Sequence, residues 1–186
     1  MSARYIPLAF VAGLFAMFEP IPASSEERVC RGKIGAVTLD NIRVPPGATC
    51  TLTGTRAKGT VKVERNATLN AREVVVIGNV QAENAQLVRV IRQSRVGGSV
   101  QVKQGGGATV ADSRIDSDIQ YESNRTQLRA LRNRVGGNIQ AFQNRGGVEI
   151  RRNRVDGNLQ CKANRPAPIG GGNIVQGSKE DQCARL

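Results

Sequence analysis

The chain repeats one short pattern at an almost constant interval. Each copy begins with Gly or Ser, and a hydrophobic residue follows two places later, in most copies with a Gln directly after it. The copies begin at Gly59, Gly78, Gly98, Ser117, Gly137 and Gly157, and Gly177 begins a last, partial copy. The intervals are 19, 20, 19, 20, 20 and 20 residues. A regular period of this length is typical of solenoids, in which each repeat packs only against its neighbours.

Hydrophobic and polar residues alternate inside each copy, which predicts β-strands. In the copy at Gly98, Val100 and Val102 are expected to face inward and Gln101 outward. A second inward column is expected two places before each copy, at Val76, Val96, Ile115, Val135, Val155 and Val175. A third is expected seven places before each copy, at Ile91, Val110, Ala130 and Ile150. Each repeat therefore holds three short strands, and no segment has a sustained helical period.

Three short strands per repeat predict an all-β fold. We expect a single-stranded right-handed parallel β-helix, a solenoid of about seven coils in which every strand pairs with its counterpart one coil away. A left-handed β-helix would show a hexapeptide rhythm, and a leucine-rich repeat would show columns of Leu. The inward columns here are mainly Val and Ile.

The N-terminal residues have the features of a secretory signal peptide. Arg4 precedes an apolar run from Tyr5 to Phe18, and cleavage is expected near Ala23. The run is shorter than the ~20 residues that a membrane-spanning helix needs, and no second run follows, so we expect no membrane span in the mature chain. We expect a secreted or periplasmic protein with a signal peptide (1–23), an N-terminal cap and first coils (24–58), β-helix repeats (59–177) and a C-terminal cap (178–186).

Four cysteines follow the expected signal peptide, an even number that suits an oxidising compartment. They allow three pairings. A bond between Cys161 and Cys183 would hold the C-terminal tail across one end of the rod, and a bond between Cys30 and Cys50 would secure the other end. A bond from Cys30 to Cys183 would require the two ends to meet. We therefore predict the two local disulfides, which would cap the open strand edges.

Several residue types are absent or rare. The chain has no His and no Trp, which excludes Ser-His-Asp and Cys-His catalysis, HExxH zinc sites and zinc fingers with His ligands. Beyond the first twenty residues the aromatic residues are Tyr121 and Phe142. The core must therefore consist of Val, Ile, Leu and Ala, and bases have almost no aromatic side chains to stack on. We predict no cofactor and no sequence-specific binding of nucleic acid.

The chain is strongly basic, and many of its arginines recur with the repeat. Lys and Arg number 27 and Asp and Glu number 15, which gives a net charge of +12. An outward column is predicted at Arg95, Arg114, Arg134 and Arg154, with Arg132 and Arg152 close by. A column of one sign either forms a solvated, solubilising surface or attracts a polyanion such as an acidic polysaccharide. Both interpretations stay open on the sequence alone.

Three carboxylates concentrate near one corner, at Asp112, Asp116 and Asp118. Such a group could bind Ca²⁺ or act as a pair of glycosidase carboxylates. Arg114 lies between them, and Asp118 stands where other copies have Asn. We therefore favour corner variants that pair with the arginine column, and keep the metal site as a weaker alternative.

Amide side chains recur at the corners and on one face. Asn133 and Asn153 precede two copies, and other corner positions are expected at Asn66, Asn124, Asn144 and Asn164. Stacked amides can hydrogen-bond to the backbone and to their own copies in the next coil. The outward Gln residues, from Gln81 to Gln160, are expected to stack along the rod in the same way.

This combination of coil rhythm, inward Val and Ile columns and Asn corners resembles the parallel β-helix superfamily that includes pectate lyases, other polysaccharide-acting proteins and adhesin-like rods. The C-terminal segment resembles the end of small exported bacterial proteins of unassigned function. The segments that carry this second resemblance are Gly157-Asn-Leu-Gln-Cys161, Asn164-Arg-Pro-Ala-Pro168, Gly172-Asn173 and Lys179-Glu-Asp-Gln-Cys183.

These observations leave more than one function open. The first hypothesis is an exported, non-catalytic β-helix that binds an anionic envelope or extracellular polymer through its arginine column. The alternative is an enzyme similar to polysaccharide lyases or hydrolases, which would use Asp112, Asp116 and Asp118 together with Arg114. End-to-end assembly of rods is a third possibility.

Overall fold

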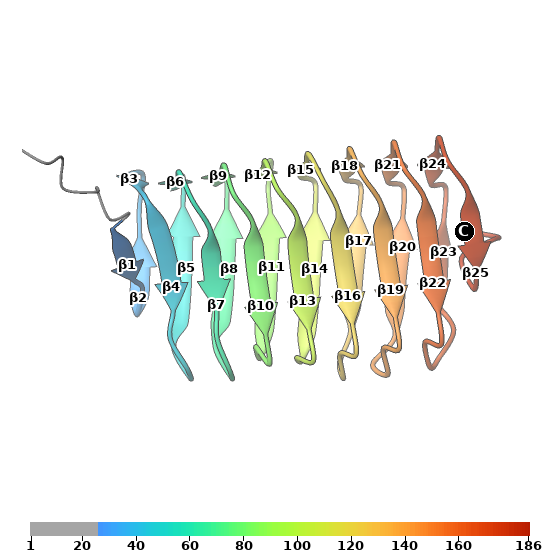
Figure 1. The fold of residues 1–186 in the computed structure, drawn as a ribbon, viewed down its shortest axis with the longest axis horizontal. Coiled ribbons are helices and arrows are strands. Elements are labelled where there is room, and N and C mark those ends of the chain that lie inside the picture. Colours follow the sequence, from blue (N-terminus) through green and yellow to red (C-terminus); the bar gives the residue numbers. More distant parts are fainter. Residues whose placement is uncertain (1–25) are drawn as a thin grey trace, which may run out of the picture.

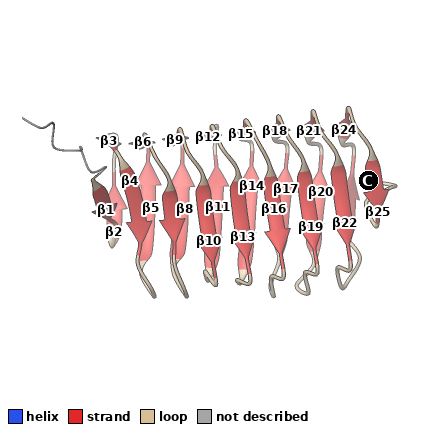
Figure 2. Ribbon diagram, in the orientation of Figure 1, coloured by secondary structure: helices blue, strands red, loops and turns tan. Residues whose placement is uncertain are grey.

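The computed structural model describes residues 26–186, so the predicted signal peptide lies outside the described part. Within these residues the regular secondary structure is entirely β, in 25 short strands (Figure 2). No helix in the described residues is long and apolar enough to cross a membrane.

The strands form three parallel sheets, here called A, B and C. Sheet A contains β1 (Glu27–Val29), β4 (Asn41–Val44), β7 (Val61–Val63), β10 (Val80–Glu83), β13 (Val100–Lys103), β16 (Ile119–Glu122), β19 (Ile139–Phe142), β22 (Leu159–Lys162) and β25 (Lys179–Asp181). Sheet B contains β2 (Gly32–Ile34), β5 (Thr49–Thr53), β8 (Thr68–Arg72), β11 (Leu87–Ile91), β14 (Gly107–Ala111), β17 (Leu128–Leu131), β20 (Val148–Arg151) and β23 (Ile169–Gly171). Sheet C contains β3 (Thr38–Leu39), β6 (Arg56–Ala57), β9 (Val75–Val76), β12 (Arg95–Val96), β15 (Arg114–Ile115), β18 (Arg134–Val135), β21 (Arg154–Val155) and β24 (Ile174–Val175).

The chain runs from sheet A to B to C in each coil, and each strand pairs with its counterpart one coil away. In Figure 1 the sheet nearest the viewer runs downward and the sheet behind it upward while the chain advances from left to right, which is a right-handed coil. The predicted parallel β-helix is therefore confirmed. It has about eight coils, because sheet A has nine strands and sheets B and C have eight. The expected number, about seven, was too low because residues 26–58 form two full coils, β1–β3 and β4–β6, without the Gly and Gln pattern.

The core is a stack of small aliphatic columns. The predicted inward residues of sheet A, such as Val100 and Ile119, are fully buried and lie in register one coil apart. Tyr121 is also buried, and its hydroxyl donates a hydrogen bond of 2.8 Å to the carbonyl oxygen of Arg129. Burial raises the pKa of the Tyr121 hydroxyl, so Tyr121 is a neutral core residue.

The third column differs from the prediction at one position. Val90, and not Ile91, pairs with Val110 and is fully buried, while Ile91 is partly exposed. The turn after β11 contains one residue more than the turn after β14, and Arg92 and Gln93 both adopt left-handed backbone conformations there, each with φ of 58°. Because of this extra residue, the buried position lies eight places before Gly98, at Val90, and not seven places before it, at Ile91.

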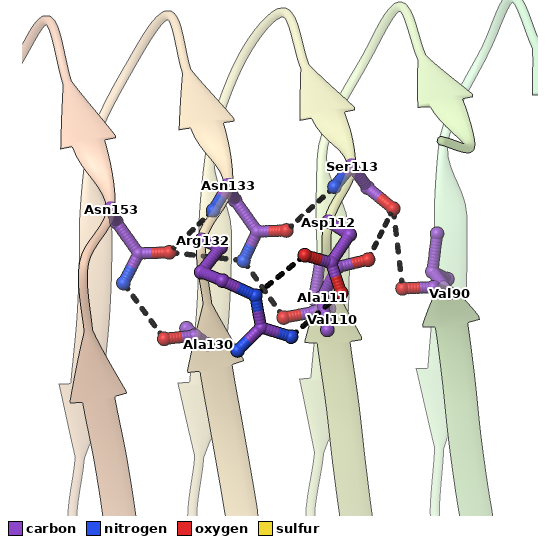
Figure 3. A network of polar contacts seen from close by, with 9 residues as sticks. All are labelled: Val90, Val110, Ala111, Asp112, Ser113, Ala130, Arg132, Asn133 and Asn153. Atoms are coloured by element: carbon purple, nitrogen blue, oxygen red, sulfur yellow. Dashed lines mark hydrogen bonds and ion pairs between the residues drawn. The ribbon is translucent and has the colours of Figure 1, made fainter. Parts of the chain in front are cut away.

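Buried Asn side chains form two ladders along the rod. In the first, Asn133 donates from Nδ2 to Asn153 Oδ1 at 3.1 Å and to the Val110 carbonyl at 2.7 Å (Figure 3). Asn153 continues the ladder to Asn173 at 3.0 Å. The second ladder joins Asn124, Asn144 and Asn164 and ends at Gln182.

The corner role predicted for Asn66 is wrong in one respect. Asn66 lies in the turn between sheets A and B, but its side chain is exposed, and Ala67 takes the buried place. This turn has one residue more before the buried position, and Asn66 adopts a left-handed conformation with φ of 57°. Asn66 is therefore a turn residue and not a member of the second ladder.

Both predicted disulfides are confirmed. Cys30 bonds Cys50 in the first coils, with Cα atoms 5.6 Å apart, and Cys161 bonds Cys183 in the last coil, with Cα atoms 5.2 Å apart. All four side chains are buried. One bond lies at each end of the stack, where the outermost strands have a neighbour on one side only.

Candidate functional site

Sheet C aligns the predicted arginine column. Each strand there has two residues. In β6, β12, β15, β18 and β21 the first residue is exposed and the second is buried, whereas in β9 the first, Val75, is partly buried. Direct pairing places four exposed arginines in register, and we call them the sheet C arginine ladder. Its members are Arg95, Arg114, Arg134 and Arg154. Neighbouring Cα atoms are separated by the spacing of parallel strands, about 4.8 Å.

Asp116 pairs with both arginines in the N-terminal half of this ladder and offsets one of their two positive charges. Its carboxylate accepts a hydrogen bond from Arg114 Nε at 2.7 Å and one from Arg95 at 3.1 Å. Partial burial opposes ionisation of Asp116, but the hydrogen bonds from Arg114 and Arg95 outweigh it and lower the pKa of Asp116 below its ordinary value. The pair of arginines therefore shares one fixed carboxylate.

Asp112 neutralises Arg132 in the same way (Figure 3). Arg132 Nε and Nη2 donate to the two carboxylate oxygens at 2.6 and 2.7 Å, a bidentate arrangement. The hydrogen bond from Arg132 is the main reason why the pKa of Asp112 is lowered. Both residues occupy equivalent left-handed turns one coil apart, with φ of 51° and 52°.

The remaining predicted arginines have no such partner. Within residues 26–186, Arg134, Arg152 and Arg154 make no side-chain hydrogen bond and no ion pair within 4.0 Å. Asp156 occupies the position equivalent to Asp116 two coils on, but it accepts a hydrogen bond from Gln176 at 3.3 Å. The six candidate arginines thus divide into an N-terminal group that is paired with aspartates and a C-terminal group that is unpaired.

The three clustered aspartates have separate roles. The predicted pairing with arginines is confirmed for Asp112 and Asp116 and is wrong for Asp118. Asp118 Oδ1 accepts hydrogen bonds from the backbone and side chain of Asn138 at 2.7 and 3.1 Å, because Asp118 replaces an Asn in a corner. No group of three potential metal ligands occurs anywhere in the part of the chain that is described. The geometry does not bring the three carboxylates together around one ion.

The outward Gln column bonds to itself toward its C-terminal end. Gln140 donates to Gln160 at 2.8 Å, and Gln160 donates to Glu180 at 2.8 Å. The predicted stacking is therefore confirmed for Gln140 and Gln160, while Gln81, Gln101 and Gln120 lie in register without a side-chain hydrogen bond between them.

Sequence reasoning missed a second set of arginines. Arg125, Arg145 and Arg165 lie in the turns between sheets A and B and line a common hollow. A signal was present, because each follows an Asn of the second ladder and the Asn-Arg pair recurs every 20 residues.

Comparison of the chain with known protein families, with curated proteins and with solved structures found no match. The resemblance to parallel β-helix proteins therefore rests on the architecture of the coil.

Proposed function

We propose that this protein is an exported, non-catalytic binding module for an anionic polymer of the cell envelope or extracellular space, with acidic polysaccharide as the favoured ligand. The observation that carries the proposal is the sheet C arginine ladder, whose C-terminal half has no carboxylate partner in the described residues. The two disulfides suit an oxidising compartment.

The electrostatics of the ladder favour an external anion. Two unit charges 4 Å apart repel by about 1 kcal/mol even in bulk water, and by more near a protein surface. Arg134 and Arg154 are held close together by strand pairing, and Arg152 lies at the adjacent corner. Guanidinium groups bind carboxylates and sulfates through paired N–H donors. A linear polymer with one acidic group on each sugar would place anions along such a row.

The test is binding to polygalacturonate by wild-type protein and by the double variant Arg134→Gln/Arg154→Gln. If each exposed ionic contact contributes about 0.2–1 kcal/mol, the double variant should bind about 2- to 30-fold more weakly. The dependence of affinity on salt should also become shallower, because fewer counterions are released.

The control variant removes the same charge at the other end of the rod. Arg31 and Lys33 are exposed and make no ion pair, so Arg31→Gln/Lys33→Gln has the same net charge as the test variant. The proposal requires this control to keep most of the affinity. Equal loss in both variants would show that bulk charge, and not the ladder, holds the polymer.

A further inference from the structure

A hollow of about 740 Å³ opens at the turns between sheets A and B. Three successive coils line it, and each contributes one arginine and one smaller side chain two places before it. The lining residues are Ser123, Arg125, Gln143, Arg145, Ala163 and Arg165. The hollow is therefore built by the repeat itself.

Backbone hydrogen bonds set the spacing of the three arginines. The N–H of Arg145 donates to the Asn124 carbonyl at 2.9 Å, and the N–H of Arg165 donates to the Asn144 carbonyl at 2.8 Å. The buried Asn ladder beneath them bonds coil to coil at 3.0 and 2.9 Å. Each arginine thus directly follows an Asn that the ladder holds in place. The Cα atoms of successive arginines are separated by about the spacing of parallel strands.

No acidic residue of the described chain forms an ion pair with these three arginines. Arg125, Arg145 and Arg165 are exposed and make no ion pair or side-chain hydrogen bond within the described chain. The other polar groups of the hollow are neutral: the Ser123 hydroxyl donates to the Gln143 side-chain oxygen at 3.3 Å. Hydroxyl and amide groups can exchange hydrogen bonds with sugar hydroxyls, and none of the lining residues is aromatic, so bases have nothing to stack on.

The hollow lies on the opposite side of the rod from the sheet C arginine ladder. In Figure 1 the strands of sheet C lie along the upper edge, and the turns between sheets A and B lie along the lower edge. The core of the solenoid separates the two rows. A short ligand cannot contact both of them at once.

We propose that Arg125, Arg145 and Arg165 form a second anion-binding site, which takes an oligosaccharide with several sulfate or carboxylate groups. The guanidinium groups bind the anions through paired N–H donors, while Ser123 and Gln143 bind neighbouring hydroxyls. This site goes beyond the proposed function and does not require the sheet C ladder to bind anything.

The experiment measures calorimetric binding of a heparin-derived hexasaccharide to protein that lacks the unpaired arginines of the sheet C ladder and the adjacent Arg152, Arg134→Gln/Arg152→Gln/Arg154→Gln. This background should still bind the hexasaccharide with a stoichiometry of one. Adding Arg125→Gln, Arg145→Gln and Arg165→Gln should weaken binding about tenfold or more, since three charge-assisted contacts are lost. The desulfated hexasaccharide should bind much more weakly to the background protein.

The matched control adds Arg31→Gln, Lys33→Gln and Arg185→Gln to the same background, because these exposed residues make no ion pair. The control should keep the affinity. Absence of binding to the background, or equal loss in the control, would overturn the second site. Equal or tighter binding of a hexathymidylate that depends on the same three arginines would overturn the assignment to sugars. The polygalacturonate test uses a different ligand and different variants, so one proposal can fail while the other holds.

Discussion

At the residue scale, the glycine that marks each repeat is explained by its neighbour in the preceding coil. Asn138 Oδ1 accepts the backbone N–H of Asn158 at 2.8 Å, and this oxygen lies where a side chain on Gly157 would begin. The marker at Ser117 is compatible with this rule because the preceding coil has Ser99, whose shorter side chain accepts the N–H of Asp118 at 3.2 Å. What recurs along the chain is therefore a steric match between a marker residue and the side chain of the preceding coil, and not one residue type.

Replacement of Gly157 by Ala should destabilise the fold. The added Cβ would lie 2.6 Å from Asn138 Oδ1 and 2.7 Å from the Gly137 carbonyl oxygen, and both atoms are held by the stack. We expect a loss of about 1–3 kcal/mol in the free energy of unfolding, measured by denaturant titration. Gly35 has open space around its Cβ position, so Gly35→Ala should change stability by less than about 0.5 kcal/mol. Similar losses in both variants would contradict this explanation.

At the element scale, sheet C shows how a two-residue strand can present a row of aligned, exposed side chains. The second residue of each inner strand is buried and fixes the register, and the first is then aligned with its copies by backbone pairing alone. Charge along the row is decided separately, by whether the aspartate at the following turn pairs with the arginines, as Asp116 does and Asp156 does not. The net charge of the ladder, on which the proposed binding rests, can therefore be altered without changing the strands.

Asp116→Asn should increase the affinity for a polyanion. The substitution keeps the shape of the side chain but removes the negative charge that Arg114 and Arg95 share. In the polygalacturonate assay we expect about 2- to 5-fold tighter binding, in the range of one exposed ionic contact. Asp156→Asn serves as the comparison and should have a smaller effect, since Asp156 forms no ion pair. An unchanged affinity for Asp116→Asn would argue against the ladder as the binding row.

Acid should weaken the fold through the same ion pairs. The pKa values of Asp112 and Asp116 are lowered in the folded state, so their stabilising effect is complete above the ordinary pKa of Asp, about 3.9. It is lost as the pH falls through the lowered folded values. The melting temperature should therefore drop as the pH falls below about 4, and less steeply in Asp112→Asn/Asp116→Asn. Parallel curves for the two proteins would show that other groups control the acid transition.

At the scale of the whole molecule, the solenoid has local contacts between neighbouring coils and two ends that need protection. The disulfides lie at these ends, one in the first coils and one in the last. The stability of such a rod is a sum over coils and their interfaces, so a weakened end can open before the centre does.

Cys161→Ser/Cys183→Ser should loosen the C-terminal coils first. Removal of a disulfide that closes a loop of this size costs about 3 kcal/mol in the chain-entropy model. Hydrogen exchange should accelerate in β22 and β25 and much less in β5 and β8. The reciprocal variant, Cys30→Ser/Cys50→Ser, should show the opposite distribution. Uniform acceleration along the rod in either variant would mean that the coils unfold as one unit.

The departures from prediction occur where the repeat changes length. Val90 and not Ile91 is buried in the core because the turn at Arg92 and Gln93 has an extra residue. Asn66 lies outside the second ladder because its turn also has an extra residue. A count from a fixed marker cannot detect an insertion inside a turn. The pairing of strands detects it, because burial selects the register.

The sequence by itself determined the coil, the inward columns apart from Ile91, and the alignment of the arginine ladder, since these follow from period-two alternation inside a period of about 20 residues. It also determined both disulfides, because the cysteines lie in pairs near the two ends of the repeat array. The tertiary structure alone decided which charges are neutralised. Arg95 meets Asp116 across 21 residues and Arg132 meets Asp112 across 20, while Arg125, Arg145 and Arg165 gather around one hollow. Side chains at the corners can point to either neighbouring coil, and periodicity carries no information about that choice.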